Sequence, residues 1–125
     1  MKKIISTSNA PAAIGPYSQA VIVNDMVYTS GIIPINPEDG TIVNGDIKEQ
    51  ADRVLKSLTA LLKDSGTDLS KVIKTTVFIK NMEDFPLVNE VYASFFTENF
   101  PARSCVEVAR LPKDVLIEIE AVAYI

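Results

Sequence analysis

The chain ends in PARSCVEVARLPKDVLIEIEAVAYI (residues 101–125), and the alternation of side chains in this stretch decides the type of fold. Apolar and polar residues alternate on both sides of a turn at 111–114, which is typical of two β-strands that each bury one face. On the first strand, one face carries Val106 and Val108, and the other carries Arg103, Cys105 and Glu107. On the second strand, one face carries Val115, Ile117 and Ile119, and the other carries Glu118 and Glu120.

These two strands predict a hairpin whose apolar faces coincide, because a slip of one residue would move charges into the core. In the registers that remain, Arg103 and Glu118 are neighbours on one face. A guanidinium that is not paired bidentately with the carboxylate is free to bind the carboxylate of a ligand. The alternative is a solvated ion pair on the polar face of an antiparallel sheet, which contributes little to stability. The pattern alone favours this second interpretation.

Two helices are predicted upstream of this stretch. Asp46, with Glu49 three residues later, resembles a capping box, and apolar residues at helical spacing follow as far as Gly66. A second helix is expected from about residue 85, with Pro86 in its first turn. It cannot extend far past residue 99, because Pro101 disfavours helical conformation in the residue before it.

Strands are predicted at 20–23, 26–30 and 72–79, with Asn24 and Asp25 forming a tight turn between the first two. The start of the chain is expected to be irregular. Pro and Gly residues make 34–45 a loop, with a short strand at 41–43.

This order of elements predicts a single domain over residues 1–125 with an α+β fold, in which a mixed six-stranded sheet is covered by two helices on one face. The other face stays bare and displays residues such as Phe78 or Val77. An uncovered, partly apolar sheet face predicts self-association, with sites possible at the seams between subunits.

Composition limits the chemistry that this chain can perform. It has 47% hydrophobic residues, a net charge of −4 and no apolar run long enough to span a bilayer, which favours a globular protein and disfavours membrane and nucleic-acid partners. It contains no histidine and one cysteine, Cys105, which disfavours a transition-metal site and excludes Ser-His and Cys-His nucleophiles. A single cysteine forms no internal disulfide, so a cytoplasmic location is expected.

Four further residues are candidates for a binding site. Tyr17 follows a stiff Gly-Pro turn and either caps a pocket or anchors its loop, and the anchor is favoured. Ser30 and Gly31 end a strand. They either approach a ligand or simply precede a turn, and the turn is the favoured interpretation. Cys105 shares the face of Arg103, where it is expected to be a pocket wall and not a nucleophile.

Four stretches carry a family resemblance: NAPAAIGPYSQA (9–20), YTSGIIPINPEDG (28–40), VIKTTVFIKNMEDFPLVNEVYASFF (72–96) and PARSCVEVARLPKDVLIEIEAVA (101–123). They run through nearly the whole chain, and the last one is a specific signature. On these residues the chain resembles the RidA family (reactive intermediate deaminase A, also called YjgF-like). The resemblance implies a chorismate-mutase-like fold and a homotrimer with a barrel-like core and a ligand cleft at each subunit interface.

The resemblance also implies an activity, namely hydrolysis of 2-iminobutanoate and 2-iminopropanoate to 2-oxo acids and ammonia without a cofactor. These imines arise from enamines that pyridoxal-phosphate dehydratases release from threonine or serine. Carried onto this sequence, Arg103 would bind the substrate carboxylate and Glu118 would position the attacking water. The residues implied to line the cleft are Tyr17, Ser30, Gly31, Asn89 and Cys105. Ile32 stands where many members carry Gln, which implies a less polar pocket rim.

Two other functions stay open at this point. A non-catalytic protein that binds small carboxylates, such as a 2-oxo acid sensor, would use the same arginine. An endoribonuclease or translation inhibitor has been attributed to relatives, but the net charge of −4 and the absence of histidine count against it.

Overall fold

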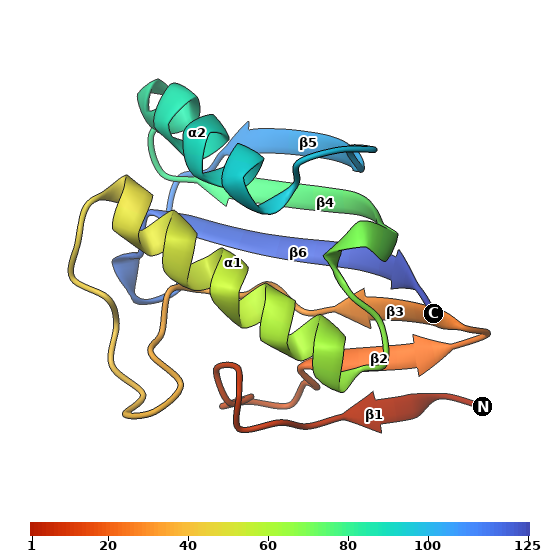
Figure 1. Ribbon diagram of the computed structural model, residues 1–125. Helices are drawn as coiled ribbons and strands as arrows, with labels where there is room; N and C mark the ends of the chain where they lie inside the picture. The colour runs from red at the N-terminus through yellow and green to blue at the C-terminus, as the bar shows by residue number, and fades with distance from the viewer.

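The computed structural model describes residues 1–125 and contains one mixed six-stranded sheet with strand order β1-β2-β3-β6-β4-β5 (Figure 1). The strands are β1 Lys3–Ile5, β2 Ala20–Val23, β3 Met26–Thr29, β4 Val72–Ile79, β5 Ala102–Glu107 and β6 Ile117–Tyr124. Only β4 and β5 pair in parallel, and every other neighbouring pair is antiparallel.

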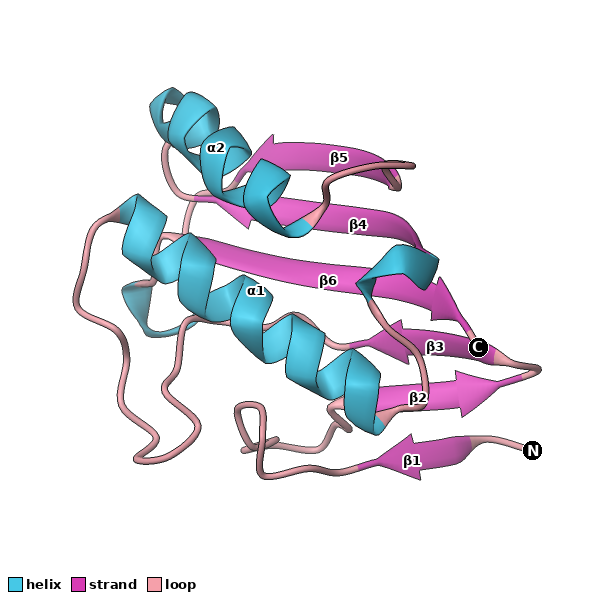
Figure 2. Ribbon diagram, viewed as in Figure 1, coloured by secondary structure: helices cyan, strands magenta, loops and turns pink.

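Two helices, α1 Ile47–Asp64 and α2 Phe85–Phe95, lie on the same face of this sheet (Figure 2). The predicted α+β architecture, with a mixed sheet covered on one side, is therefore confirmed. Short 3₁₀ turns occupy Leu69–Lys71, Met82–Asp84 and Pro112–Asp114. No helix has the length and apolar character that crossing a bilayer would require.

The ends of α1 follow the predicted chemistry. The Asp46 carboxylate accepts a hydrogen bond from the backbone N–H of Glu49 at 3.0 Å, which satisfies a donor that the first helical turn leaves free. Gly66 has a φ of 89°, so the chain leaves the helix through a left-handed residue that suits glycine. The apolar side of the helix packs on the sheet, with Val54, Leu55 and Leu58 completely buried.

The first half of the chain agrees with the prediction in its hairpin and differs from it at residues 3–5 and 41–43. Asn24 and Asp25 both have positive φ and form the tight turn of the β2–β3 hairpin, as predicted. The expected irregular start is wrong, because residues 3–5 form β1 on the edge of β2. The short strand expected at 41–43 is reduced to one bridge between Ile35 and Ile42. A strand of three residues, such as β1, is stabilised mainly by its partner strand. The alternation of its own side chains is therefore too short to predict it.

Helix α2 begins at Phe85, as predicted, and ends before the limit at residue 99. It ends at Phe95, and Phe96 is extended with φ of −106° and ψ of 98°. Phe96 is buried and stacks on Tyr92, with ring centroids 4.5 Å apart. Asn99 has a φ of 49°, which turns the chain toward β5. Burial of Phe96 in the core thus replaces a further helical turn.

The predicted hairpin between the last two strands is wrong. Strand β4 lies between β5 and β6, so these two strands never pair. Arg103 on β5 lies opposite Thr75 on β4, whereas Glu118 on β6 lies opposite Phe78. Thr75 and Phe78 are three residues apart, and successive strand residues alternate between faces. Arg103 and Glu118 therefore lie on opposite faces of the sheet within one chain, and the predicted shared face is also wrong.

The sheet face away from the helices is uncovered. Phe78 lies on this face, but Val77 is buried under the helices, so the expectation for Val77 was wrong. Three large apolar residues on the same face as Phe78 are exposed: Tyr28, Val106 and Tyr124. Exposed apolar residues that gather on one face of a sheet are typical of a protein–protein contact.

Candidate active site in two halves

The first half of the site surrounds Arg103, which β5 directs toward α2. Its Nη1 donates a hydrogen bond to Asn89 Oδ1 at 2.8 Å. Its guanidinium carbon lies 4.7 Å from the ring centroid of Tyr92 and 5.2 Å from that of Phe85. None of the ion pairs of the protein involves Arg103. A guanidinium stacked on two rings, with no carboxylate partner and free N–H donors, is suited to bind an anionic group.

A cleft of about 440 Å³ opens beside this guanidinium, a size that suits a small metabolite. It is lined by Asn89, Tyr92, Ala93, Phe100, Pro101 and Arg103. The structure thus brings Arg103 and Asn89 together, as the resemblance implies. No functional role was predicted for Tyr92 or Phe100. The available signal was the polar tip of Tyr92 within an otherwise apolar helical stripe.

Cys105 lies two residues along β5 on the same face as Arg103, as predicted. Burial raises the pKa of its thiol, and the positive charge of Arg103 opposes this only in part. The thiol is therefore not activated toward a thiolate. Cys105 packs against the core and is not among the residues that line the Arg103 cleft.

The second half of the site lies on the other side of the sheet around Glu118. A cleft of about 400 Å³ is lined by Ile14, Tyr17, Ser30, Gly31, Ile33, Pro112, Lys113 and Glu118. Four of the candidate residues from three distant parts of the chain therefore meet here: Tyr17, Ser30, Gly31 and Glu118. Lys113 is an additional cation in this cleft that no sequence motif indicated.

Gly31 is required for the placement of the Glu118 carboxylate. A Cβ atom at this position would lie 2.6 Å from Cδ of Glu118 and closer still to Oε2. The approach is close because Ile32 pairs with Ile119, with N–H···O distances of 2.8 and 3.1 Å in the two directions. Ile32 itself is buried in the core, so it does not form the pocket rim that the resemblance implies.

Two side chains fix the loop that carries Tyr17. The Ser30 hydroxyl donates a hydrogen bond to the backbone oxygen of Ser18 at 2.6 Å. Gln19 is buried, and its amide donates to Pro11 O at 2.7 Å and accepts from Thr7 N at the same distance. Tyr17 remains half exposed at the mouth of the cleft. Gln19 was missed because its role depends on loop residues that are distant in sequence.

The Glu118 carboxyl is protonated more readily in this protein than a glutamate in water. Burial raises the pKa of the Glu118 carboxyl, and the like charge of Glu120 raises it further. No ion pair offsets these effects within one chain. A carboxylate with a raised pKa can accept a proton from water more readily than an ordinary glutamate.

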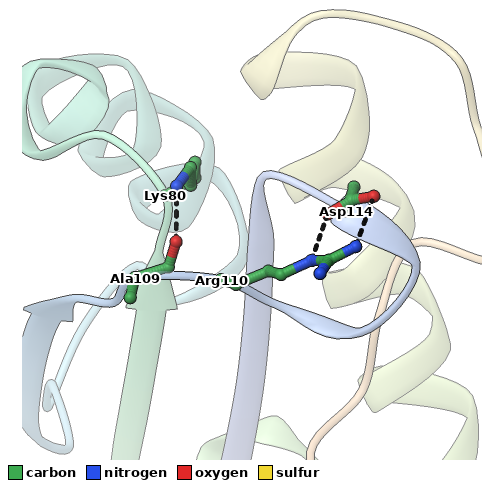
Figure 3. Close-up of polar contacts among 4 residues, drawn as sticks. All are labelled: Lys80, Ala109, Arg110 and Asp114. Carbon is green, nitrogen blue, oxygen red and sulfur yellow. Dashed lines mark hydrogen bonds and ion pairs between the residues drawn. The ribbon is translucent and has the colours of Figure 1, made fainter.

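The connection between β5 and β6 is held by exposed polar contacts (Figure 3). Arg110 Nε and Nη2 donate to the two oxygens of Asp114 at 2.8 and 3.3 Å, and Lys80 Nζ donates to the backbone oxygen of Ala109. Lys113 and Asp114 both have a φ of 55°, a conformation that is unfavourable for residues other than glycine. These contacts hold the tight turn that places Lys113 at the Glu118 cleft.

The mixed sheet and the two helices over one face define an α+β domain with a cleft of small-molecule size on either side of the sheet. The chain belongs to the family described as endoribonuclease L-PSP, the RidA (YjgF-like) family, whose model matches residues 7–125.

Known proteins resemble this chain over almost its full length. It is 54% identical to the 2-iminobutanoate/2-iminopropanoate deaminase of Escherichia coli strain K12, with 98% of each chain covered. It is 55% identical to AldR of Lactococcus lactis, which is named as a candidate regulator, with 97% of this chain and 96% of that protein covered. The crystal structure of Escherichia coli TdcF with bound serine matches with a TM-score of 0.94 at 48% identity, and 98% of each chain is covered.

Proposed function

We propose that this protein hydrolyses 2-imino acids such as 2-iminobutanoate and 2-iminopropanoate to 2-oxo acids and ammonia, without a cofactor. The observation that carries the proposal is the Arg103 guanidinium, which lies in a metabolite-sized cleft and has no carboxylate partner in the protein. The name of the Escherichia coli relative supports the activity, and the bound serine in TdcF supports a ligand that carries a carboxylate.

In this mechanism, Arg103 binds the substrate carboxylate through its planar fork. Glu118 accepts a proton from water as the water oxygen bonds to C2 of the imine. The electron pair of the C=N bond moves to nitrogen, which takes this proton back from Glu118 and gives a carbinolamine. Glu118 then transfers the proton of the new hydroxyl group to nitrogen as the C–N bond breaks, which releases ammonia and leaves the C=O group of the 2-oxo acid. The imine is already electrophilic, so orientation and one general base replace a histidine or a covalent step.

The other candidates have supporting roles in this proposal. Tyr17, Ser30 and Gly31 line the Glu118 cleft, and Asn89 orients Arg103. Cys105 lies two residues along β5 from Arg103 and lines neither cleft within one chain, so a role as a cleft wall depends on the assembled protein. The carboxylate clamp and the base lie on opposite faces of one sheet, so neither cleft is a complete site by itself.

We therefore propose that the complete site forms between subunits of a homotrimer. One subunit supplies Arg103 and the next supplies Glu118. The uncovered sheet face, with Tyr28 and Val106 exposed on it, supports this assembly. A cytoplasmic location belongs to the same proposal, since pyridoxal-phosphate dehydratases would release the substrates there. The net charge of −4 opposes binding to nucleic acid.

The proposal predicts faster release of 2-oxobutanoate from 2-iminobutanoate that is generated in situ by a threonine dehydratase. Arg103→Ala should lower kcat/KM by at least about 100-fold, because two charge-assisted hydrogen bonds to the substrate are lost. Lys56→Ala, which removes an exposed positive charge on α1, is the matched control and should retain full activity. Glu118→Gln should slow the chemical step while 2-oxobutanoate still binds.

The name of AldR favours one alternative, a sensor that binds 2-oxo acids without catalysis. The same experiment separates the two functions. Binding of 2-oxobutanoate by the wild-type protein, with imine hydrolysis no faster than in water, would support the sensor and exclude the deaminase. Normal turnover in Arg103→Ala would exclude the carboxylate-clamp role.

A further inference from the structure

Tyr92 is placed beneath Arg103 by contacts on several sides. Its hydroxyl lies 2.8 Å from the hydroxyl of Thr75, which is completely buried. Thr75 is also the residue that pairs with Arg103 across the β4–β5 ladder. The ring of Tyr92 stacks on Phe96 at 4.5 Å and lies 4.7 Å from the guanidinium carbon of Arg103. One tyrosine therefore connects the sheet, the helix and the clamp.

The hydrogen bond to Thr75 has a consequence for the orientation of the ring. A buried tyrosine that bonds only through its tip cannot rotate its ring axis away from Thr75 without leaving a polar group unpaired. The hydrogen bond thus fixes the axis of the ring, and packing against Phe96 and Arg103 holds its plane. Asn89 accepts a hydrogen bond from Nη1, and the Nε and Nη2 groups of Arg103 have no partner in the protein.

We propose that Tyr92, fixed by Thr75, is a positioning residue that holds the Arg103 guanidinium in its carboxylate-binding orientation before any ligand arrives. The role of Arg103 in this statement rests on the function proposed above. An arginine side chain has many rotamers, and a ligand that must order it binds more weakly than one that finds it ordered. The stacked ring supplies this order through a cation–π contact. Tyr92 itself does not need to touch the substrate.

The experiment compares Tyr92→Leu and Tyr92→Phe with the matched control Phe96→Leu, which removes a ring from the same cluster without removing the one closest to Arg103. Calorimetry measures the dissociation constant of 2-oxobutanoate. NMR of the ligand-free protein follows the Nε–H proton of Arg103, whose chemical shift reports the nearby ring and the mobility of the side chain. Imine hydrolysis gives KM and kcat separately.

Tyr92→Leu should weaken 2-oxobutanoate binding about tenfold, the loss expected for a partly desolvated cation–π contact. KM should rise by a similar factor while kcat changes little, since binding is lost equally in the ground and transition states. The ring-current shift of the Arg103 Nε–H proton should shrink to the part that the Phe85 ring supplies. Tyr92→Phe keeps the ring but loses the hydrogen bond to Thr75 that fixes it. Its affinity should therefore fall less than that of Tyr92→Leu, by about threefold, whereas Phe96→Leu should keep both the shift and the affinity.

Unchanged affinity and an unchanged Arg103 signal in Tyr92→Leu would overturn the proposal. If that variant does not fold, the wild-type spectrum still tests the proposal. A mobile Arg103 Nε–H proton without a ring-current shift would show that the guanidinium is not held on the Tyr92 ring. These outcomes are separate from the fate of the deaminase function. A wild-type protein that binds 2-oxobutanoate without hydrolysing imines would disprove the activity and leave the role of Tyr92 measurable. If 2-oxobutanoate does not bind, the NMR comparison of the variants decides.

Discussion

At the scale of single residues, the carboxylate of Glu118 is only partly solvated and has no ion-pair partner within the chain. Burial is the main reason that its pKa is raised, and Glu120, two residues along the same strand face, adds to it. A base acts only in its ionised form. The activity should therefore fall, as the pH is lowered, at a higher pH than an ordinary glutamate would give.

Glu120→Gln tests this relation. Removal of the like charge lowers the pKa of Glu118, so the base stays ionised to lower pH and the acid limb of the kcat/KM profile moves in that direction. Glu118→Gln should lose this limb. The measurement is kcat/KM for 2-iminobutanoate from acidic to neutral pH in the three proteins.

Glu90→Gln is the matched control, since Glu90 is an exposed carboxylate on α2 that pairs with Lys48. Protonation of the imine affects all variants equally, so the difference between profiles isolates the protein group. An acid limb that stays in place in Glu120→Gln would contradict the assignment of this limb to Glu118.

At the scale of elements, α1 packs on the sheet through a largely apolar side that also buries Gln50 and Ser57. The side chain of Gln50 is hydrogen-bonded to Val43 O and Leu116 N. Ser57 is completely buried in the middle of this helix, and its hydroxyl has no hydrogen-bond partner. A buried donor without a partner is destabilising because it has lost its hydrogen bonds to water. Alanine at the same place keeps the Cβ and has a higher helix propensity.

Ser57→Ala should therefore raise the free energy of unfolding by about 1 kcal/mol, as measured by urea denaturation. Ser65→Ala is the matched control at the end of the same helix. Ser65 is also buried, but its hydroxyl donates to Leu61 O at 2.7 Å, so its removal should bring no gain. A loss of stability in Ser57→Ala would show that this hydroxyl has a partner in solution.

At the scale of the whole molecule, the separation of Arg103 and Glu118 by the sheet has a direct consequence. A single subunit carries two half-sites that face different ways. Subunits related by a closed rotation can join the Arg103 half of one to the Glu118 half of the next. Function would then depend on assembly even though both halves are formed in each chain.

Mixed assembly tests this composite site. Arg103→Ala and Glu118→Gln should each be nearly inactive alone, but equal amounts refolded together should regain about a quarter of wild-type activity, because random pairing joins an intact Arg103 to an intact Glu118 at one interface in four. The measurement is imine hydrolysis by the whole refolded mixture. Mixed trimers purified by differential tags should reach about a third of wild-type activity, because each contains one intact interface in three. Folding each variant separately and mixing afterwards without exchange is the control. No recovery in verified mixed trimers would place the complete site within one subunit.

Structural features that depend on nearby residues were predicted correctly. The Asp46 cap, the left-handed Gly66 and the Asn24–Asp25 turn each follow from residues that lie within a few positions of one another. The helical and alternating patterns placed both helices and most strands. Residue type and spacing drew attention to Arg103, Glu118 and Tyr17 but favoured no functional role for them. The family resemblance supplied those roles and added Asn89.

Which strands are neighbours depends on contacts between distant segments of the chain. The observed strand order separates the two halves of the predicted site. Two strands joined by a short turn looked like a hairpin, but the β4–α2–β5 crossover places β5 parallel to β4 at the edge, and β6 pairs with the other side of β4. Pairing depends on backbone hydrogen bonds between distant segments, which side-chain alternation does not encode. That insertion of β4 puts Arg103 and Glu118 on opposite faces and seats Arg103 on Tyr92.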